Sequence, residues 1–128
     1  MTPLGSQLLQ AVEAVKMLDP VSAANTAAAT SGWIDVRKYE GDIKITVQLG
    51  AVTGSIAWTL EDATDGSGTG AAGITPNEGA FAAGAANQIQ KRTLNGSAVR
   101  GWIRLVGTIV TGPALVAANL AGHPKYTS

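Results

Sequence analysis

The sequence contains no cysteine, which excludes a disulfide framework, a thiolate zinc site and a cysteine nucleophile. Its single histidine, His123, lies in an expected C-terminal tail and has no second ligand-type histidine with which to hold a metal ion. The apolar runs are only a few residues long, well short of the ~20 that a membrane helix needs. The start also lacks a basic segment followed by an apolar core, so we expect a soluble chain without an export signal. We also expect the protein to bind neither a cofactor nor a metal ion.

Charged residues are scarce as well. They make up 14% of the chain, against about 25% in an average domain, while hydrophobic residues account for 45%. One explanation is a compact domain with a surface of Ala, Thr and Ser. The other, which we favour, is that partners cover much of the surface, because the cores of protein–protein interfaces are similarly poor in charge.

The charges are unevenly distributed along the chain. All nine acidic residues precede Gly79, and with four basic residues they give the first 78 residues a net charge of −5. The remaining 50 residues carry five basic residues and no acidic ones. If the two parts interleave in one fold, the charges offset each other. If they face opposite ways, the result is a dipolar module that can associate head to tail.

A two-residue alternation of apolar and polar side chains begins at Trp33 and predicts antiparallel strands. Residues 42–49 and 55–61 are expected to pair through a turn at 50–54. Asn95-Gly96, a typical type I′ turn, predicts a second hairpin that joins 87–94 to a return strand at 99–110. A last short strand is expected at 114–116. Several short strands with Gly and Asn turns indicate an all-β protein with a single-domain antiparallel β-sandwich.

The N-terminal region is ambiguous. Leu8, Val12 and Val15 follow helical spacing, whereas Leu9 and Met17 fit one face of a strand. Residues 21–32 are small and polar and are expected to form a surface loop or an arm that reaches a neighbour. We therefore divide the domain into an N-terminal segment and Ala-rich arm at 1–31, a sandwich body at 32–121 and a tail at 122–128.

The return strand at 99–110 carries bulky residues on both faces. Such a strand is either central in a layered domain or has its outer face covered by a partner. Gly101 and Gly107 are expected at bulges or close backbone approaches. The three tryptophans, Trp33, Trp58 and Trp102, are expected in the core.

Two motifs contain the residue types of a nucleotide site and a cation site but lack the neighbouring elements or the spacing that such sites need. Residues 68–73 fit G-x-G-x-x-G, but no helix is expected after them and no acidic residue follows Glu78, so we interpret them as a flexible loop. Glu61, Asp62 and Asp65 could hold a hard cation, but they lack the spacing of a calcium loop and are interpreted as an acidic turn. No catalytic residue is predicted, and we expect a protein that is not an enzyme.

The strongest basic cluster combines Lys91 and Arg92 with the stretch Arg100, Trp102 and Arg104. Across the predicted hairpin these residues could share one face. Nucleic-acid binding would need a stronger positive field than a net charge of zero provides. We therefore weigh a polar outer face against a protein interface, which Arg and Trp often anchor.

The order of features from Ala14 to Val116 resembles the capsid cement, or decoration, proteins of tailed bacteriophages. The similar pieces are Asp19-Pro20, an Ala- and Thr-rich link, residues 32–36, Tyr39-Glu40-Gly41, residues 53–61, residues 99–104 and residues 108–112. None of these pieces is a catalytic signature.

The resemblance implies a jelly-roll-like sandwich that forms homo-oligomers, with a trimer favoured over a dimer, on the outside of the capsid. It implies the major capsid protein as partner, no nucleic acid or membrane, and synthesis in the bacterial cytoplasm. It also favours the strand interpretation of the N-terminal region. Alternatives are a tail, fibre or carbohydrate-binding module, or a hydrolase that uses Glu61 and Glu78. The candidate interface residues are Leu9, Val12, Arg100, Trp102 and Arg104.

Overall fold

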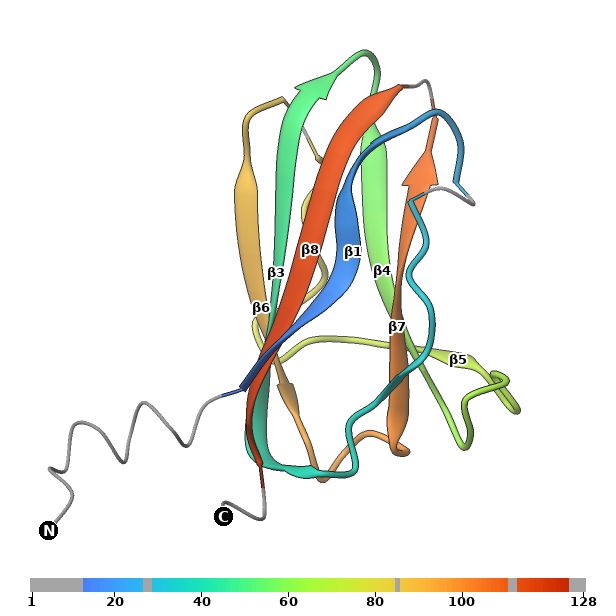
Figure 1. The fold of residues 1–128 in the computed structure, drawn as a ribbon, viewed down its shortest axis with the longest axis vertical. Coiled ribbons are helices and arrows are strands. Elements are labelled where there is room, and N and C mark those ends of the chain that lie inside the picture. The colour runs from blue at the N-terminus through green and yellow to red at the C-terminus, as the bar shows by residue number, and fades with distance from the viewer. Residues whose placement is uncertain (1–12, 27–28, 85, 111–112, 125–128) are drawn as a thin grey trace, which may run out of the picture.

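The structure, a computed structural model, describes residues 13–26, 29–84, 86–110 and 113–124 (Figure 1). These residues form eight strands and no helix, so no membrane-spanning helix occurs within the described ranges. The strands are β1 (Glu13–Ala23), β2 (Ile34–Asp35), β3 (Tyr39–Val52), β4 (Ile56–Ala63), β5 (Ala72–Ile74), β6 (Ile89–Asn95), β7 (Trp102–Ile109) and β8 (Ala114–Pro124).

The strands form two four-stranded antiparallel sheets that pack face to face. One sheet has the order β1-β8-β3-β6 and the other has the order β2-β7-β4-β5. Every connection except β4–β5 carries the chain from one sheet to the other. This is the strand order of a jelly roll, and it confirms the predicted all-β sandwich.

The core lies between the two sheets and is built by alternation along each strand. The side chains of β3 at Ile43, Ile45, Val47 and Leu49 point inward and are at most 3% exposed. Burial of an aliphatic side chain of this size stabilises the fold by roughly 1.5–3 kcal/mol. The opposing sheet contributes Ile56, Trp58, Leu60, Ile103 and Leu105.

The predicted pairing of residues 42–49 with 55–61 is wrong. β3 pairs with β6 and β8, whereas β4 pairs with β5 and β7. Both strands carry one apolar face, and the sandwich brings these faces together across the core instead of joining the strands edge to edge. The alternation of apolar and polar residues identifies the buried face of a strand. The same alternation is found in a neighbouring strand of the sheet and in a strand of the opposing sheet, so it does not identify the pairing.

The predicted Asn95-Gly96 hairpin is also wrong, because β6 lies in one sheet and β7 in the other. The backbone N–H of Ala98 donates to the Asn95 carbonyl oxygen at 2.9 Å, and the Ser97 N–H donates to Asn95 Oδ1 at 3.1 Å. The asparagine side chain thus shapes a local turn. The positive φ that a type I′ turn needs occurs at neither Asn95 nor Gly96.

The segment before β2 stays within the domain. Ser31 donates its N–H to the Leu105 carbonyl oxygen at 2.8 Å, and its hydroxyl accepts the Leu105 N–H at 2.9 Å. The Gly107 N–H donates to the Ala29 carbonyl oxygen at 3.1 Å. Residues 29–32 of the predicted arm therefore run beside β7 and extend its sheet.

Strands also form in parts of the chain that were expected to lie outside the sandwich body. Residues 13–18 belong to β1, which agrees with the strand interpretation, and residues 6–12, with Leu9 and Val12, lie outside the described residues. The last strand is longer than the predicted 114–116, because β8 continues to Pro124 and includes His123. Glu13 pairs with Gly122, so the first and last strands are neighbours.

The acidic and basic parts of the chain interleave. Arg100 binds Asp62 at 2.9 Å and Arg104 binds Glu61 at 2.7 Å, so basic residues after Gly79 pair with acidic residues before it. Of the two arrangements left open by the sequence, the fold adopts the one in which the charges offset each other.

Candidate interaction surface

The outer face of β1, β8 and β3 is hollowed and is poor in charge around Thr46 and Gln48. Toward the start of β3 the same face is charged, since Asp42 and Lys44 line a further hollow there. On β8, the buried side chains of Val116, Ala118 and Leu120 alternate with outward-pointing residues that are small or neutral. Thr46 and Gln48 occupy the matching outward positions on β3. The outward residues of β8 in this region are Leu115, Ala117, Asn119 and Ala121.

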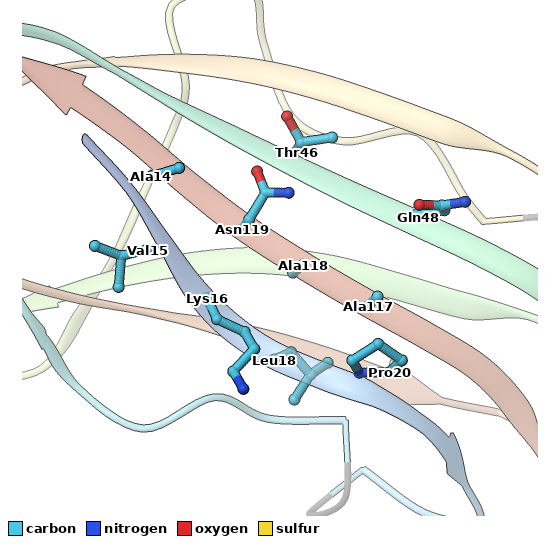
Figure 2. A pocket seen from close by; sticks show the side chains of 10 residues that line it. All are labelled: Ala14, Val15, Lys16, Leu18, Pro20, Thr46, Gln48, Ala117, Ala118 and Asn119. Atoms are coloured by element: carbon cyan, nitrogen blue, oxygen red, sulfur yellow. The ribbon is translucent and has the colours of Figure 1, made fainter. Parts of the chain in front are cut away.

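Two adjoining hollows lie on this face. The first has a volume of about 290 Å³ and is formed where β1, β8 and β3 run side by side (Figure 2). The second has a volume of about 430 Å³ and lies toward Val21, Gly50 and Leu115. Gln48, Pro20 and Ala117 border both hollows, so the two form one continuous depression.

Among the described residues that line the two hollows, Lys16 alone is charged. Its ammonium lies 2.6 Å from Asp19 Oδ1, and this hydrogen bond raises the pKa of Lys16. Both side chains are about 70% exposed at the β1 edge, so the pair contributes little to stability. The centre of the face is left with the neutral hydrogen-bonding groups of Thr46, Gln48 and Asn119.

The chemistry of this face suits a protein partner. Small side chains let another backbone approach closely, and three neutral polar groups can hydrogen-bond without the cost of desolvating a charge. None of the lining residues is aromatic, so the face lacks the stacking platform that a carbohydrate site needs. Within the described residues, no three His, Cys, Asp or Glu side chains gather to hold a metal ion.

The edge of this sheet at β6 is covered by the chain itself. Glu78 accepts the backbone N–H of Thr93 and its hydroxyl, both at 2.7 Å, and the Asn77 N–H donates to the Thr93 carbonyl oxygen at 2.8 Å. Gln90 makes two further hydrogen bonds to the backbone of Ala82. Because the Asn77 and Glu78 bonds occupy the backbone N–H and carbonyl of Thr93, this part of the β6 edge is protected from pairing with another sheet.

The predicted interface residues Arg100, Trp102 and Arg104 lie in the other sheet, at the opposite end of the molecule from the β3–β4 turn. Arg104 stacks over Trp33 with its guanidinium carbon 4.7 Å from the ring centre, and its Nε donates to Glu61. Arg37 lies 5.4 Å from the Trp102 ring centre. The arginines and tryptophans therefore contact each other within the chain.

Arg100 makes the densest set of bonds in this cluster. Its guanidinium donates to Asp62 Oδ1 at 2.9 Å and to the Gly70 carbonyl oxygen at 2.6 Å. Its backbone N–H donates to Asp62 Oδ2 at 3.1 Å. These bonds tie the start of β7 to the end of β4 and to the glycine-rich loop.

The expected single basic face does not form. Lys91 and Arg92 lie on β6 in one sheet, and Arg100 and Arg104 lie on or beside β7 in the other. The tryptophan prediction is confirmed only for Trp58, which is 3% exposed. Trp33 and Trp102 are half-buried outside the core, because the arginines and the glycine loop cover their rings.

The acidic and glycine-rich motifs have local structural roles. Asp62 and Glu61 bind separate arginines, while the Thr69 hydroxyl and the backbone N–H groups of Thr69 and Ser67 lower the pKa of Asp65. Gly68 adopts a φ of +83°, and a Cβ there would lie 2.9 Å from Trp33 Nε1. The G-x-G-x-x-G stretch therefore comprises the end of the loop between β4 and β5, where Gly68 packs against Trp33, and the first two residues of β5.

The residues of the hollowed face were not predicted from the sequence. β8 is rich in alanine and carries an asparagine, and both residues are depleted in strands. The signal available was the alternation from Ala114 to Leu120, which leaves small or neutral residues at every second position.

No known protein family and no curated protein matches the sequence. Among solved structures, the chain is similar to the SPBc2 prophage-derived protein YomS, with a TM-score of 0.50, 11% identity, and coverage of 87% of this chain and 93% of that one. The infectious bursal disease virus structure (Gx strain) gives a TM-score of 0.45 at 12% identity, covering 91% and 34%. A xylanase from Clostridium thermocellum with a CBM22-1 module gives 0.46 at 10% identity, covering 93% and 27%. The likeness to YomS establishes a shared fold.

Proposed function

We propose that this protein is a structural component of a virus particle, a capsid cement protein that binds the outside of a bacteriophage head as a homo-oligomer. It stabilises contacts between neighbouring copies of the major capsid protein. The observation that carries this proposal is the hollowed face of β1, β8 and β3, where Lys16 is the one charged lining residue among those described.

Binding is driven by burial of the hollowed face against the capsid shell. A face of small and neutral side chains loses little on leaving water, and each Å² of apolar area buried contributes about 25 cal/mol. A shell repeats the same contact many times, so a modest gain at each site adds up to a large stabilisation of the whole particle. The jelly-roll order, which is common among capsid proteins, supports the same proposal.

Neither the carbohydrate-binding nor the hydrolase alternative gains support from the site. The hollows lack an aromatic side chain, as described above. Glu61 binds Arg104, and Glu78 binds the edge of β6, so each carboxylate of the suggested catalytic pair has a structural partner.

The test begins with purified particles of the source virus, in which the protein should be found by mass spectrometry and labelled on the outer surface by antibody. Particles that lack the protein should then bind the purified chain. Thr46→Lys, which places a long cation in the hollow of about 290 Å³, should weaken this binding at least tenfold. Absence of the protein from particles, or full binding by this variant, would contradict the proposal.

A matched control is available on the other sheet. Thr59 is exposed on the outer side of β4, where it pairs with Val106. Thr59→Lys makes the same chemical change away from the hollows and should leave binding unchanged. Equal loss in both variants would indicate a general effect of added charge.

A further inference from the structure

One end of the sandwich carries no charge. At this end β1, β3 and β7 finish and β4, β6 and β8 begin, at the top of Figure 1. The stretches that build it are residues 20–26, 48–57, 86–90 and 108–117, which contain no Asp, Glu, Lys, Arg or His. We call the described residues of these stretches the uncharged end.

The same end carries all the large hydrophobic side chains that are exposed among the described residues. These are Val110 at 73% exposure, Ile89 at 60%, Leu115 at 46% and Val21 at 39%. They come from four different strands or strand ends, so only the fold brings them together. A gathering of exposed apolar side chains is typical of an interaction site.

Most of the ion pairs lie at the other end, whereas the Lys16–Asp19 pair lies beside the uncharged end. The ion pairs Arg100–Asp62, Arg104–Glu61 and Arg37–Asp35 all lie where β4 finishes or where β2 and β7 begin. Glu13, Lys38, Glu40 and Asp42 lie at the start of β1 and β3. Charged residues are therefore more numerous at one end of the long axis than at the other.

The absence of charge indicates what kind of partner the uncharged end accepts. Where copies of one chain meet around a rotation axis, the residues next to the axis lie near their own counterparts, so a charge at that place meets a like charge. A different protein imposes no such restriction, because it can offer the opposite charge. A surface without either sign of charge therefore avoids this repulsion and suits contact between identical copies close to an axis.

Shape supports the same partner. The hollow of about 430 Å³ lies beside Leu115 and Val21, so this end offers both protruding apolar side chains and a depression. Identical copies can therefore fill each other's hollows from a single type of surface. Head-to-tail stacking would instead place the charged end against apolar side chains and desolvate its charges without new partners.

We propose that the uncharged end is the surface through which copies of this chain associate around a rotation axis. This inference rests on the self-association included in the proposed function and assigns it to a surface. The other part of the hollowed face, around the hollow of about 290 Å³ between β1, β8 and β3, is then left to contact the capsid shell.

The test compares oligomer mass across variants of the full chain. Sedimentation velocity of the wild-type protein over a range of concentrations should show a closed oligomer. Val110→Glu and Leu115→Glu each place a like charge at the contact and should weaken self-association at least tenfold. Both positions are exposed in the single chain, and circular dichroism with thermal melting checks that the variants fold.

Ala98→Glu provides the control, because Ala98 is exposed in the turn after β6 at the charged end. This variant should keep the wild-type mass. A wild-type protein that stays monomeric at high concentration would overturn the inference. So would Val110→Glu and Leu115→Glu proteins that fold and keep the wild-type mass.

Shell binding separates this inference from the proposed function. A monomeric chain that binds capsids would leave the capsid-binding part of the proposed function intact and overturn the inference. An oligomer that depends on Val110 and Leu115 but binds no capsid would do the reverse. If the Glu variants lose capsid binding and keep the oligomer mass, this end contacts the shell and the inference is wrong.

Discussion

Arg100 encloses the carboxylate of Asp62 with both its backbone N–H and its guanidinium, and Asp62 is only 4% exposed. The arginine is the partner of a carboxylate that is otherwise cut off from water. The pair joins the end of β4 to the start of β7, which are far apart in the sequence.

Arg100→Ala should therefore destabilise the fold by about 2–3 kcal/mol, because it leaves a buried carboxylate without its cation. Urea denaturation at neutral pH measures the loss. Arg37→Ala is the control, since the Arg37–Asp35 pair is exposed and its removal should cost less than about 1 kcal/mol. Equal losses in the two variants would show that the burial of Asp62 does not matter.

Gly107 lies where β7 passes closest to the core. A Cβ at this position would be 2.7 Å from Trp58 Cζ3 and 2.9 Å from the Ala29 carbonyl oxygen. Gly107→Ala should destabilise the protein by about 1–3 kcal/mol through overpacking. Thermal melting should show a lower Tm. Gly73→Ala, on β5 with no atom within 4 Å of the added Cβ, should change the free energy of unfolding by less than about 0.5 kcal/mol.

The Glu78 carboxylate makes stability depend on pH. The hydroxyl and N–H of Thr93 donate to it and hold its pKa below the ordinary value of 4.5. A carboxyl with a lowered pKa in the folded state stabilises that state above pH 4.5, and this contribution is lost as the pH falls through the folded-state value. The stability of the wild-type protein should therefore exceed that of Glu78→Gln at pH 6, and the difference should shrink toward pH 3.

Urea titrations at several pH values provide the measurement. Glu40→Gln, a change of an exposed carboxylate on β3, is the matched control. A constant difference between the wild-type protein and Glu78→Gln from pH 6 to pH 3 would contradict the assigned hydrogen bonds.

Arg104 covers one face of Trp33 and pairs with Glu61. Arg104→Ala should destabilise the fold by about 1–2 kcal/mol, because both the cation–π contact and the ion pair are lost. Tryptophan fluorescence should shift to longer wavelength as Trp33 becomes exposed, and the shift should vanish in a Trp33→Phe background. Lys44→Ala, an exposed cation on β3, should leave both signals unchanged.

The strands were predictable where apolar and polar residues alternate, as in 42–49 and 55–61. Their partners were not, because the pattern records only which face is buried, and the sandwich satisfies it across the core as well as within a sheet. Asn95-Gly96 correctly predicted a turn, but the turn connects strands of different sheets instead of forming a hairpin within one sheet. The core position of Trp58 followed from its phase with Ile56 and Leu60.

The candidate surfaces were less predictable than the fold. Residue type identified Arg100, Trp102 and Arg104 in the sequence. It did not identify their contacts within the chain, because Asp62 and Glu61 on β4 and the ring of Trp33 are distant in the sequence. The uncharged end is built from four stretches that are far apart in the sequence. The sequence shows that each stretch lacks charged residues, but only the sheet order brings the four together.

Pairing of Glu13 with Gly122 places the first described residue of β1 and the last residues of β8 side by side, at the end away from Val110 and Leu115. A peptide inserted behind Pro124 would therefore begin far from the surface proposed for self-contact. Cargo attached at this position would leave Val110 and Leu115 accessible.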